Sequence, residues 1–307
     1  MITEQVRGYF GFERIPFDRS LAVSQLFASA THNEATARIG YAIATRGLAV
    51  VTGEVGAGKT VAIRAATACL DASRYQVIYL PNPQVGARGI HHAVVAALGG
   101  VPRFHHATLI PQAAAALAAE TAERGRVPVL LVDEAHLLSH DQLEAIRMLS
   151  NADLDSASPL AIVLTGQPQL RANMKLGVLA ALDQRITVRY AMQPMTPEET
   201  TAYLRHHTRA AGRSDALFSD DAAAFLHHAA RGYPRAVNRL AVAALIATYA
   251  ARKTIADEAA ARAAAAEVSD QCTPPSPPGH ASSRPRRIIA APSASSAPAT
   301  RLTSRPA

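Results

Sequence analysis

Short apolar runs alternate with longer helical patterns along the first two thirds of the chain. The short runs are apolar at consecutive positions, which is typical of strands that are buried on both faces in a parallel sheet covered by helices. Between them, apolar residues recur every three or four positions, which predicts helices. The pattern predicts strands at 48–52, 75–80, 129–132, 160–164 and 186–190, and helices near 33–46, 60–70, 89–98, 111–124, 141–151 and 169–175.

The region after Pro194 shows only helical patterns, at 197–211, 220–230, 234–251 and 257–268. An α/β domain followed by a small all-helical domain is therefore expected. We predict an α/β domain at 1–194, built on a parallel five-stranded sheet with flanking helices, and a helical domain at 195–270.

The remaining residues, 271–307, form a tail that is rich in Pro, Ser and Ala. Such a composition cannot bury enough apolar surface to offset the entropy of ordering, so we predict that the tail is disordered. It holds five arginines and no acidic residue, so +5 of the formal charge of +7 belongs to it. The tail is either an inert extension or a basic arm that touches DNA or a partner, and the body carries no strong nucleic-acid signature.

The composition excludes several classes of protein. With 49% hydrophobic residues among 307, the chain can bury a sizeable core. Cys69 and Cys272 are too far apart to suggest a spaced motif, which excludes a disulfide framework or a cysteine-based zinc site. No apolar run is long enough to span a bilayer, and the N-terminus lacks the apolar segment of a signal peptide. We therefore expect a cytoplasmic protein that does not enter membranes.

A phosphate-binding loop follows the first predicted strand and opens a predicted helix. Glycines in such a loop let backbone N–H groups converge on phosphate oxygens, and the helix N-terminus adds its positive end. Lys59 would reach the β- and γ-phosphates, and the Thr60 hydroxyl would bind Mg²⁺. The loop consists of Gly53, Glu54, Val55, Gly56, Ala57, Gly58, Lys59 and Thr60.

Two acidic residues, Asp133 and Glu134, end the third predicted strand. A buried carboxylate is costly unless it is paired or bound to a metal, so we predict that Asp133 faces the phosphate loop and binds Mg²⁺. Glu134 would then polarise the attacking water. The string of residues 133–136, DEAH, also labels a helicase group, but such a helicase needs a second nucleotide-facing α/β domain, and only helices and the tail follow.

Several motifs, in order across residues 8–250, resemble those of AAA+ ATPases, specifically the general secretion pathway A-type group and its transposon-borne relatives. These are YFGF at 9–12 with Pro16 and Phe17, the phosphate loop, LLVDEAH, LTGQPQL, LDQRI and GYPRAVN. The resemblance implies a P-loop NTPase fold, in which the helical domain is a lid, and ATP with Mg²⁺ as ligands.

The same resemblance implies a role for each matching residue. Lys59 and Thr60 belong to Walker A, and Asp133 and Glu134 to Walker B. Sensor 1 is Thr165 or Gln167, Arg185 is an arginine finger that acts on the neighbouring subunit, and Arg235 is sensor 2 in the lid. The adenine pocket is expected to use the segment 10–17.

The family resemblance leaves several functions open. The favoured hypothesis is an accessory ATPase of DNA transposition, a homo-oligomer that acts on double-stranded DNA with a transposase. A secretion-system ATPase is expected to add a membrane span and a wall-binding domain, and a replication initiator or loader to add a DNA-binding domain after the lid. A switch that binds ATP without hydrolysing it is disfavoured by Glu134 and Arg185.

Four pairs of adjacent histidines, at 91–92, 105–106, 206–207 and 227–228, invite a metal-site hypothesis. Adjacent helical residues point about 100° apart, so the two histidines of a pair cannot chelate the same ion well. We predict that these histidines lie at the surface.

Overall fold

A computed structural model describes residues 2–18, 21–81, 86–151 and 158–270. The predicted disorder of 271–307 lies outside these residues. None of the helices within the described ranges is long and apolar enough to cross a membrane.

The sheet has five strands in the order β2-β3-β4-β1-β5, and all neighbouring strands are parallel. This confirms the predicted fold class, and each predicted strand end lies within two residues of the observed one. The sequence pattern does not give the order of the strands, and β4 lies between β1 and β3. The strands are β1 (Leu48–Thr52), β2 (Tyr75–Leu80), β3 (Val127–Val132), β4 (Ala161–Gly166) and β5 (Ile186–Ala191).

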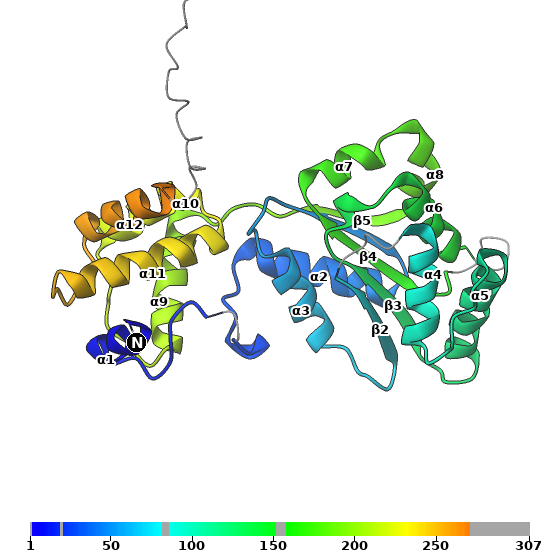
Figure 1. Ribbon diagram of the computed structural model, residues 1–307, viewed down its shortest axis with the longest axis horizontal. Helices are drawn as coiled ribbons and strands as arrows, with labels where there is room; N and C mark the ends of the chain where they lie inside the picture. The colour runs from blue at the N-terminus through cyan, green and yellow to red at the C-terminus, as the bar shows by residue number, and fades with distance from the viewer. Residues whose placement is uncertain (1, 19–20, 82–85, 152–157, 271–307) are drawn as a thin grey trace, which may run out of the picture. The chain divides into compact units, whose positions relative to one another are not determined.

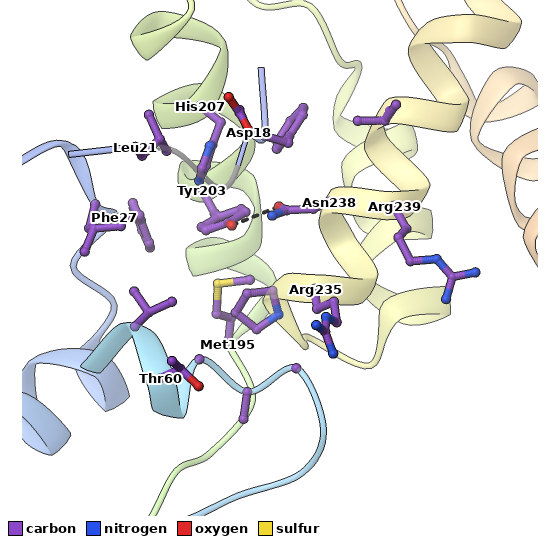
Figure 2. Close-up of a pocket in the computed structure, with 18 of the residues that line it drawn as sticks. Asp18, Leu21, Phe27, Thr60, Met195, Tyr203, His207, Arg235, Asn238 and Arg239 are labelled. Atoms are coloured by element: carbon purple, nitrogen blue, oxygen red, sulfur yellow. Dashed lines mark hydrogen bonds between the residues drawn. The ribbon is translucent and has the colours of Figure 1, made fainter. Parts of the chain in front are cut away.

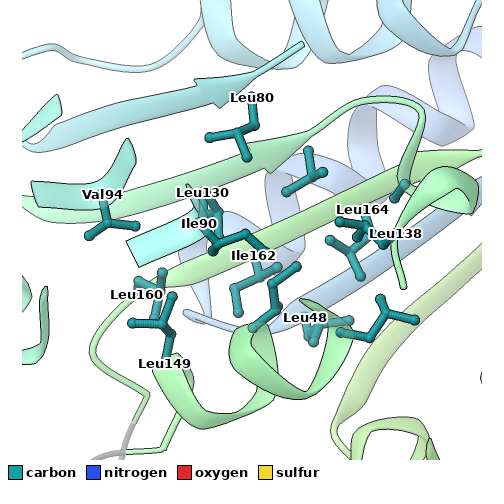
Figure 3. Close-up of a cluster of buried hydrophobic side chains, with 14 of the residues drawn as sticks. Leu48, Leu80, Ile90, Val94, Leu130, Leu138, Leu149, Leu160, Ile162 and Leu164 are labelled. Carbon is teal, nitrogen blue, oxygen red and sulfur yellow. The ribbon is translucent and has the colours of Figure 1, made fainter. Parts of the chain in front are cut away.

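Helices cover both faces of the sheet. The helices α2 (Ala30–Ala44) and α3 (Lys59–Ala68) pack on one face, and α4 (Gly86–Ala97), α5 (His106–Ala122) and α6 (His140–Leu149) pack on the other (Figure 1). The second face holds a large apolar core in which strand and helix side chains interdigitate (Figure 3). The strands β1, β3 and β4 are almost entirely buried, as their continuous apolar runs predict.

Most helices begin where a local signal is present. Capping boxes of Ser139 with Gln142 and of Thr196 with Glu199 start α6 and α9 (Pro197–Ala210), because in each pair the side-chain oxygen of one residue accepts from the backbone N–H of the other. Helix α5 begins five residues before the predicted start at Pro111, which lies inside it, because the backbone N–H groups of two residues in the preceding turn donate to the His105 carbonyl. The sequence pattern did not predict α1 (Ile2–Phe10), α8 (Ala180–Gln184) or the short 3₁₀ turns η1 (Val23–Gln25), η2 (Ala135–Leu137) and η4 (Gly177–Leu179).

The helices after the sheet have their own apolar core. This core joins the helices α9, α10 (Asp220–Ala230), α11 (Pro234–Ala250) and α12 (Glu258–Asp270). Phe10, Phe12 and Phe17 from the N-terminal segment belong to the same core. The division at 194/195 therefore stays a prediction, and the segment that precedes η1 packs with the helical core rather than with the sheet.

The predicted surface position is wrong for two of the histidines. His91 is 2% exposed, and its Nδ1 lies 3.0 Å from the carbonyl oxygen of Ala87, so a backbone partner compensates for its burial. His207 is 5% exposed, and its ring stacks on Phe17 with a centroid distance of 5.1 Å. Their neighbours His92 and His206 are more exposed, so adjacent members of a pair do face different ways.

Candidate nucleotide-binding site

The strand order brings three chain segments to one edge of the sheet. Because β4 lies between β1 and β3, the carboxyl ends of these parallel strands are adjacent. The phosphate loop follows β1, and Asp133 and Glu134 follow β3. Gln167 follows β4 and is the N-cap residue of the helix α7 (Pro168–Met174). Ligands of open α/β sheets bind at this edge.

The phosphate loop depends on two glycines with positive φ. Gly56 has φ +85° and Gly58 has φ +95°, and residues with a Cβ rarely adopt this conformation. Gly58 is the residue before α3, so the loop leads into the helix N-terminus. This geometry fits phosphate binding at backbone N–H groups.

Lys59 lies within the loop that it would serve. Its Nζ donates to the carbonyl oxygens of Gly53 at 2.9 Å and Glu54 at 3.0 Å, and the residue is 6% exposed. Burial lowers the pKa of Lys59, while the nearby carboxylates of Glu134 and Asp133 oppose this decrease. A buried ammonium that donates to neutral carbonyls is suited to exchange them for phosphate oxygens.

Asp133 is the most densely bonded polar side chain of the site. One carboxylate oxygen accepts from Thr60 Oγ1 at 2.7 Å, and the other accepts from Thr165 Oγ1 at 2.8 Å and from the Glu134 backbone N–H at 2.9 Å. The residue is 5% exposed, so these bonds compensate for the desolvation of its charge. They also link α3, β3 and β4 at one point.

The Thr60–Asp133 pair fits a magnesium ion. Hydroxyl and carboxylate oxygens are hard ligands, and Mg²⁺ in phosphate-transfer sites typically takes one or two protein ligands together with substrate oxygens. Within the described residues, no group of three or more His, Cys, Asp and Glu side chains forms a separate metal site. The two residues are therefore the ones that would hold the ion.

Glu134 has an unusual backbone. Its φ is +51° and ψ is +34°, in the left-handed region, which costs a non-glycine residue about 1–2 kcal/mol. The carboxylate is 45% exposed, and one of its oxygens lies 3.4 Å from Nδ1 of His136. Strain of this kind is often retained where it orients a functional side chain.

Arg235 brings the helical part of the chain to the phosphate loop. It lies in the first turn of α11, after Pro234, and its backbone N–H donates to the Gly56 carbonyl at 3.3 Å. A Cβ on Gly56 would lie 2.7 Å from the Cβ of Arg235, so only glycine permits this approach. Both residues line a cavity of about 750 Å³, together with Lys59, Thr60 and Glu134. Figure 2 shows Arg235 and Thr60 at this cavity.

A family model described as an AAA domain matches residues 43–174, which include the phosphate loop and the acidic pair. General secretion pathway protein A of Aeromonas hydrophila is 33% identical over 256 residues, which are 79% of this chain and 44% of that protein. The chain belongs to the AAA+ family. It spans less than half of the length of that relative.

Solved AAA+-like structures share the fold. The Aeropyrum pernix ORC2 protein, in ADPNP–ADP complexes, has a TM-score of 0.62 and 14% identity, with 82% of this chain and 70% of that chain covered. The ORC1 protein of the same organism, in complex with DNA, has a TM-score of 0.57 and 14% identity, with 80% and 67% covered. At this identity the likeness concerns the fold alone.

The two candidates for sensor 1 differ in what they contact. Thr165 is fully buried, and its hydroxyl donates to the Asp133 carboxylate at 2.8 Å. Gln167 is partly exposed at the start of α7, and its backbone N–H points to Nδ1 of His136 at 3.5 Å. The choice between them stays open, because the Thr165 hydroxyl is already engaged by Asp133.

Arg185 lies apart from the cavity of its own AAA+ domain. It follows α8, and its guanidinium donates to Asn151 Oδ1 at 3.1 Å and to the Ser150 carbonyl at 3.5 Å. Among the described residues, those that line the cavity do not include Arg185. Its proposed role on a neighbouring subunit stays a prediction.

Sequence reasoning missed the aromatic end of the cavity. Phe27, Tyr203 and His207 line it, and the Tyr203 hydroxyl donates to Asn238 Oδ1 at 2.8 Å. Of the segment 10–17, which was expected to serve the adenine, Phe17 lines the cavity. The helical spacing of Tyr203 and His207 (i, i+4) is a signal that places both on one face of α9, but the sequence does not indicate that this face meets the nucleotide site.

This aromatic end makes the stability of the protein depend on pH. Burial lowers the pKa of His207 from 6.5 to about 4, with His206 and Arg14 adding to the decrease. His207 therefore takes up a proton near pH 6.5 in the unfolded chain, but only near pH 4 in the folded chain. The folded state loses stability as the pH falls through this range. At pH 5 the loss is about 2 kcal/mol.

We expect the His207→Phe variant, which keeps an aromatic ring, to lack this contribution. Between pH 7.5 and pH 5, the free energy of unfolding measured with urea should fall by about 2 kcal/mol less in the variant than in the unmodified chain. His228→Phe, at an exposed position of α10, is the matched control and should leave the pH dependence unchanged. Equal pH dependence of the His207→Phe variant and the unmodified chain would contradict the assignment.

Proposed function

We propose that this chain binds ATP with Mg²⁺ and hydrolyses it to ADP and phosphate. The observation that carries the proposal is that Lys59, Thr60, Glu134 and Arg235 line one cavity, while Asp133 accepts a hydrogen bond from Thr60 Oγ1 at 2.7 Å. The division into an AAA+ domain at 1–194, a lid at 195–270 and a disordered tail is part of the same proposal.

Each residue has a distinct part in the proposed reaction. Lys59 exchanges its carbonyl partners for β- and γ-phosphate oxygens, and Thr60 and Asp133 hold Mg²⁺, which neutralises phosphate charge when it is bound. Glu134 accepts a proton from the attacking water, whose oxygen forms a bond to the γ-phosphorus. The bond from that phosphorus to the bridging oxygen of ADP breaks, and the left-handed backbone at Glu134 keeps its carboxylate at the cavity.

Arg235 would make the lid sensitive to the nucleotide. Its backbone already contacts Gly56, and its side chain lines the cavity. A guanidinium there can pair with phosphate oxygens while ATP is bound and lose that partner after hydrolysis and phosphate release. The position of the lid helix α11 would thus depend on which nucleotide is present.

We expect Glu134→Gln to separate binding from hydrolysis. Glutamine retains the shape of the side chain but cannot accept the proton, so the ATPase rate should fall by about 10²–10⁴-fold while ATP affinity stays within a few-fold. Lys59→Ala should instead lose affinity, because the phosphate charge is no longer compensated. Calorimetric titration with ATP and a phosphate-release assay distinguish the two, and an equal loss of affinity and rate in Glu134→Gln would mean that Glu134 is structural.

We further propose that the active form is a homo-oligomer in which Arg185 reaches the nucleotide of the neighbouring subunit. Its position directly before β5, the strand at one edge of the sheet, supports this. An arginine that stabilises the charge on the transferred phosphoryl group contributes about 10³–10⁵ in rate.

Mixing two inactive variants tests this arrangement. Arg185→Ala and Lys59→Ala should each be nearly inactive, because each lacks one half of a composite site. In mixed assemblies, some interfaces join an intact Lys59 site to an intact Arg185, so part of the ATPase activity should return. No recovery in mixtures whose co-assembly is verified by pull-down of differently tagged subunits would show that Arg185 acts within its own chain.

For the biological role, we propose an accessory ATPase that acts on double-stranded DNA with a transposase. The order of motifs shared with transposon-borne relatives supports this role, and a fold shared with an ORC1 protein solved with DNA is compatible with it. A part in a secretion complex is the alternative, favoured by the identity to general secretion pathway protein A.

DNA-dependent ATPase activity separates the two roles. If phosphate contacts hold the protein on DNA, duplex DNA of random sequence should stimulate ATP hydrolysis at 50 mM salt, and the stimulation should fall steeply by about 200 mM because counterion release weakens binding. The Glu134→Gln variant should retain ATP-dependent binding to DNA. Absence of both stimulation and ATP-dependent binding at low salt would rule out the transposition role and leave the ATPase proposal intact.

A further inference from the structure

His136 occupies the junction between Glu134 and the end of β4. Its side chain is 7% exposed, and its Nδ1 lies 3.4 Å from a carboxylate oxygen of Glu134 and 3.5 Å from the backbone N of Gln167. Both groups thus converge on one ring nitrogen. Neither contact was part of the proposed roles of Walker B and sensor 1.

The packing around His136 holds its backbone close to the end of β4. A Cβ on Gly166 would lie 3.0 Å from the backbone N of His136 and 3.4 Å from its Cβ, so β4 can approach this closely because residue 166 is glycine. His136 belongs to the turn η2, which the Leu137 N–H closes by donating to the Glu134 carbonyl at 2.9 Å. The backbone of His136 is therefore held close to the end of β4, and its largely buried side chain contacts both Glu134 and Gln167.

One nitrogen cannot serve both partners at once. When Nδ1 lacks a hydrogen, it accepts from the Gln167 N–H and offers nothing to the carboxylate; when it carries one, it donates to Glu134 and cannot accept from Gln167. Both contacts are long for hydrogen bonds, as expected where two partners compete for one atom. A shift of Gln167 relative to His136 would therefore change how firmly the Glu134 carboxylate is held.

We propose that His136 is a positioning residue for Glu134, and that its Nδ1 couples the orientation of this base to the end of β4. The inference rests on the proposed ATPase function. A ligand that contacts the β4 end, such as the γ-phosphate of ATP, changes the Gln167 contact and thereby the orientation of the carboxylate. The energy comes from the exchange of one hydrogen-bond partner for another at a ring that is 7% exposed.

Two amide substitutions test the role of this nitrogen. The amide of Asn occupies the place of Nδ1 and can both donate and accept, whereas the longer Gln places its amide near the position of Nε2. We expect His136→Asn to retain kcat within about threefold. In His136→Gln, kcat should fall about tenfold or more, because a poorly oriented Glu134 supplies only part of the contribution of a well-placed general base. KM for ATP should stay within about twofold in both, because the phosphate loop is unchanged.

Folding and position controls accompany these variants. His140→Gln changes an exposed histidine at the start of α6 and should leave kcat unchanged. The melting temperatures of the Asn and Gln variants are expected to be similar. Equal kcat for the Asn and Gln variants, whether both high or both low, would overturn the role of Nδ1.

A double-mutant cycle identifies the partner of His136. In the Glu134→Gln background, single-turnover hydrolysis should be no slower after His136→Gln than before, since the base is already absent. The same tenfold loss in both backgrounds would show that His136 acts independently of Glu134 and would overturn the inference. If the unmodified chain hydrolyses no ATP, the proposed function itself fails, and this outcome is distinct from either result.

Discussion

The buried carboxylate of Asp133 is the interaction on which the nucleotide site depends. An unpaired charge at this depth would cost several kcal/mol, and three donors from three segments compensate for it. The donors are the hydroxyls of Thr60 and Thr165 and the backbone N–H of Glu134. Because they come from α3, from β4 and from the residue after β3, they fix the relative positions of the phosphate loop, the base and the end of β4.

This arrangement also determines what a magnesium ion would change. The Thr60 hydroxyl now donates to one carboxylate oxygen of Asp133, and these two oxygens would hold the ion when it is bound with ATP. The other oxygen of Asp133 keeps its two donors, so the carboxylate need not rotate to accept the ion. One carboxylate oxygen of Asp133 thus stabilises the fold, and the other is placed to bind the ligand.

The sequence predicted the strands well because continuous apolar runs leave few alternatives to a buried parallel sheet. It also predicted the phosphate loop and the acidic pair, since each combines a motif with the required flanking strand. The order of the strands was not predictable from periodicity, so the contact of Thr165 with Asp133 followed only from β4 lying between β1 and β3. The burial of His207 escaped prediction for a similar reason, because the aromatic partner that covers its ring, Phe17, is distant in sequence.

At two positions in the site, a glycine allows a close approach between elements that are distant in sequence. Gly56 lets the backbone of Arg235 approach the phosphate loop, and Gly166 lets β4 approach the turn that carries His136. In both places a backbone, rather than a flexible side chain, makes the contact, so a small displacement on one side must be matched on the other. A nucleotide bound at the phosphate loop would therefore lie near two rigid elements that it could displace, the first turn of α11 and the end of β4. The first leads to the helical core and the second to Glu134, so under the proposed function one binding event would change both the helical part and the rate of hydrolysis.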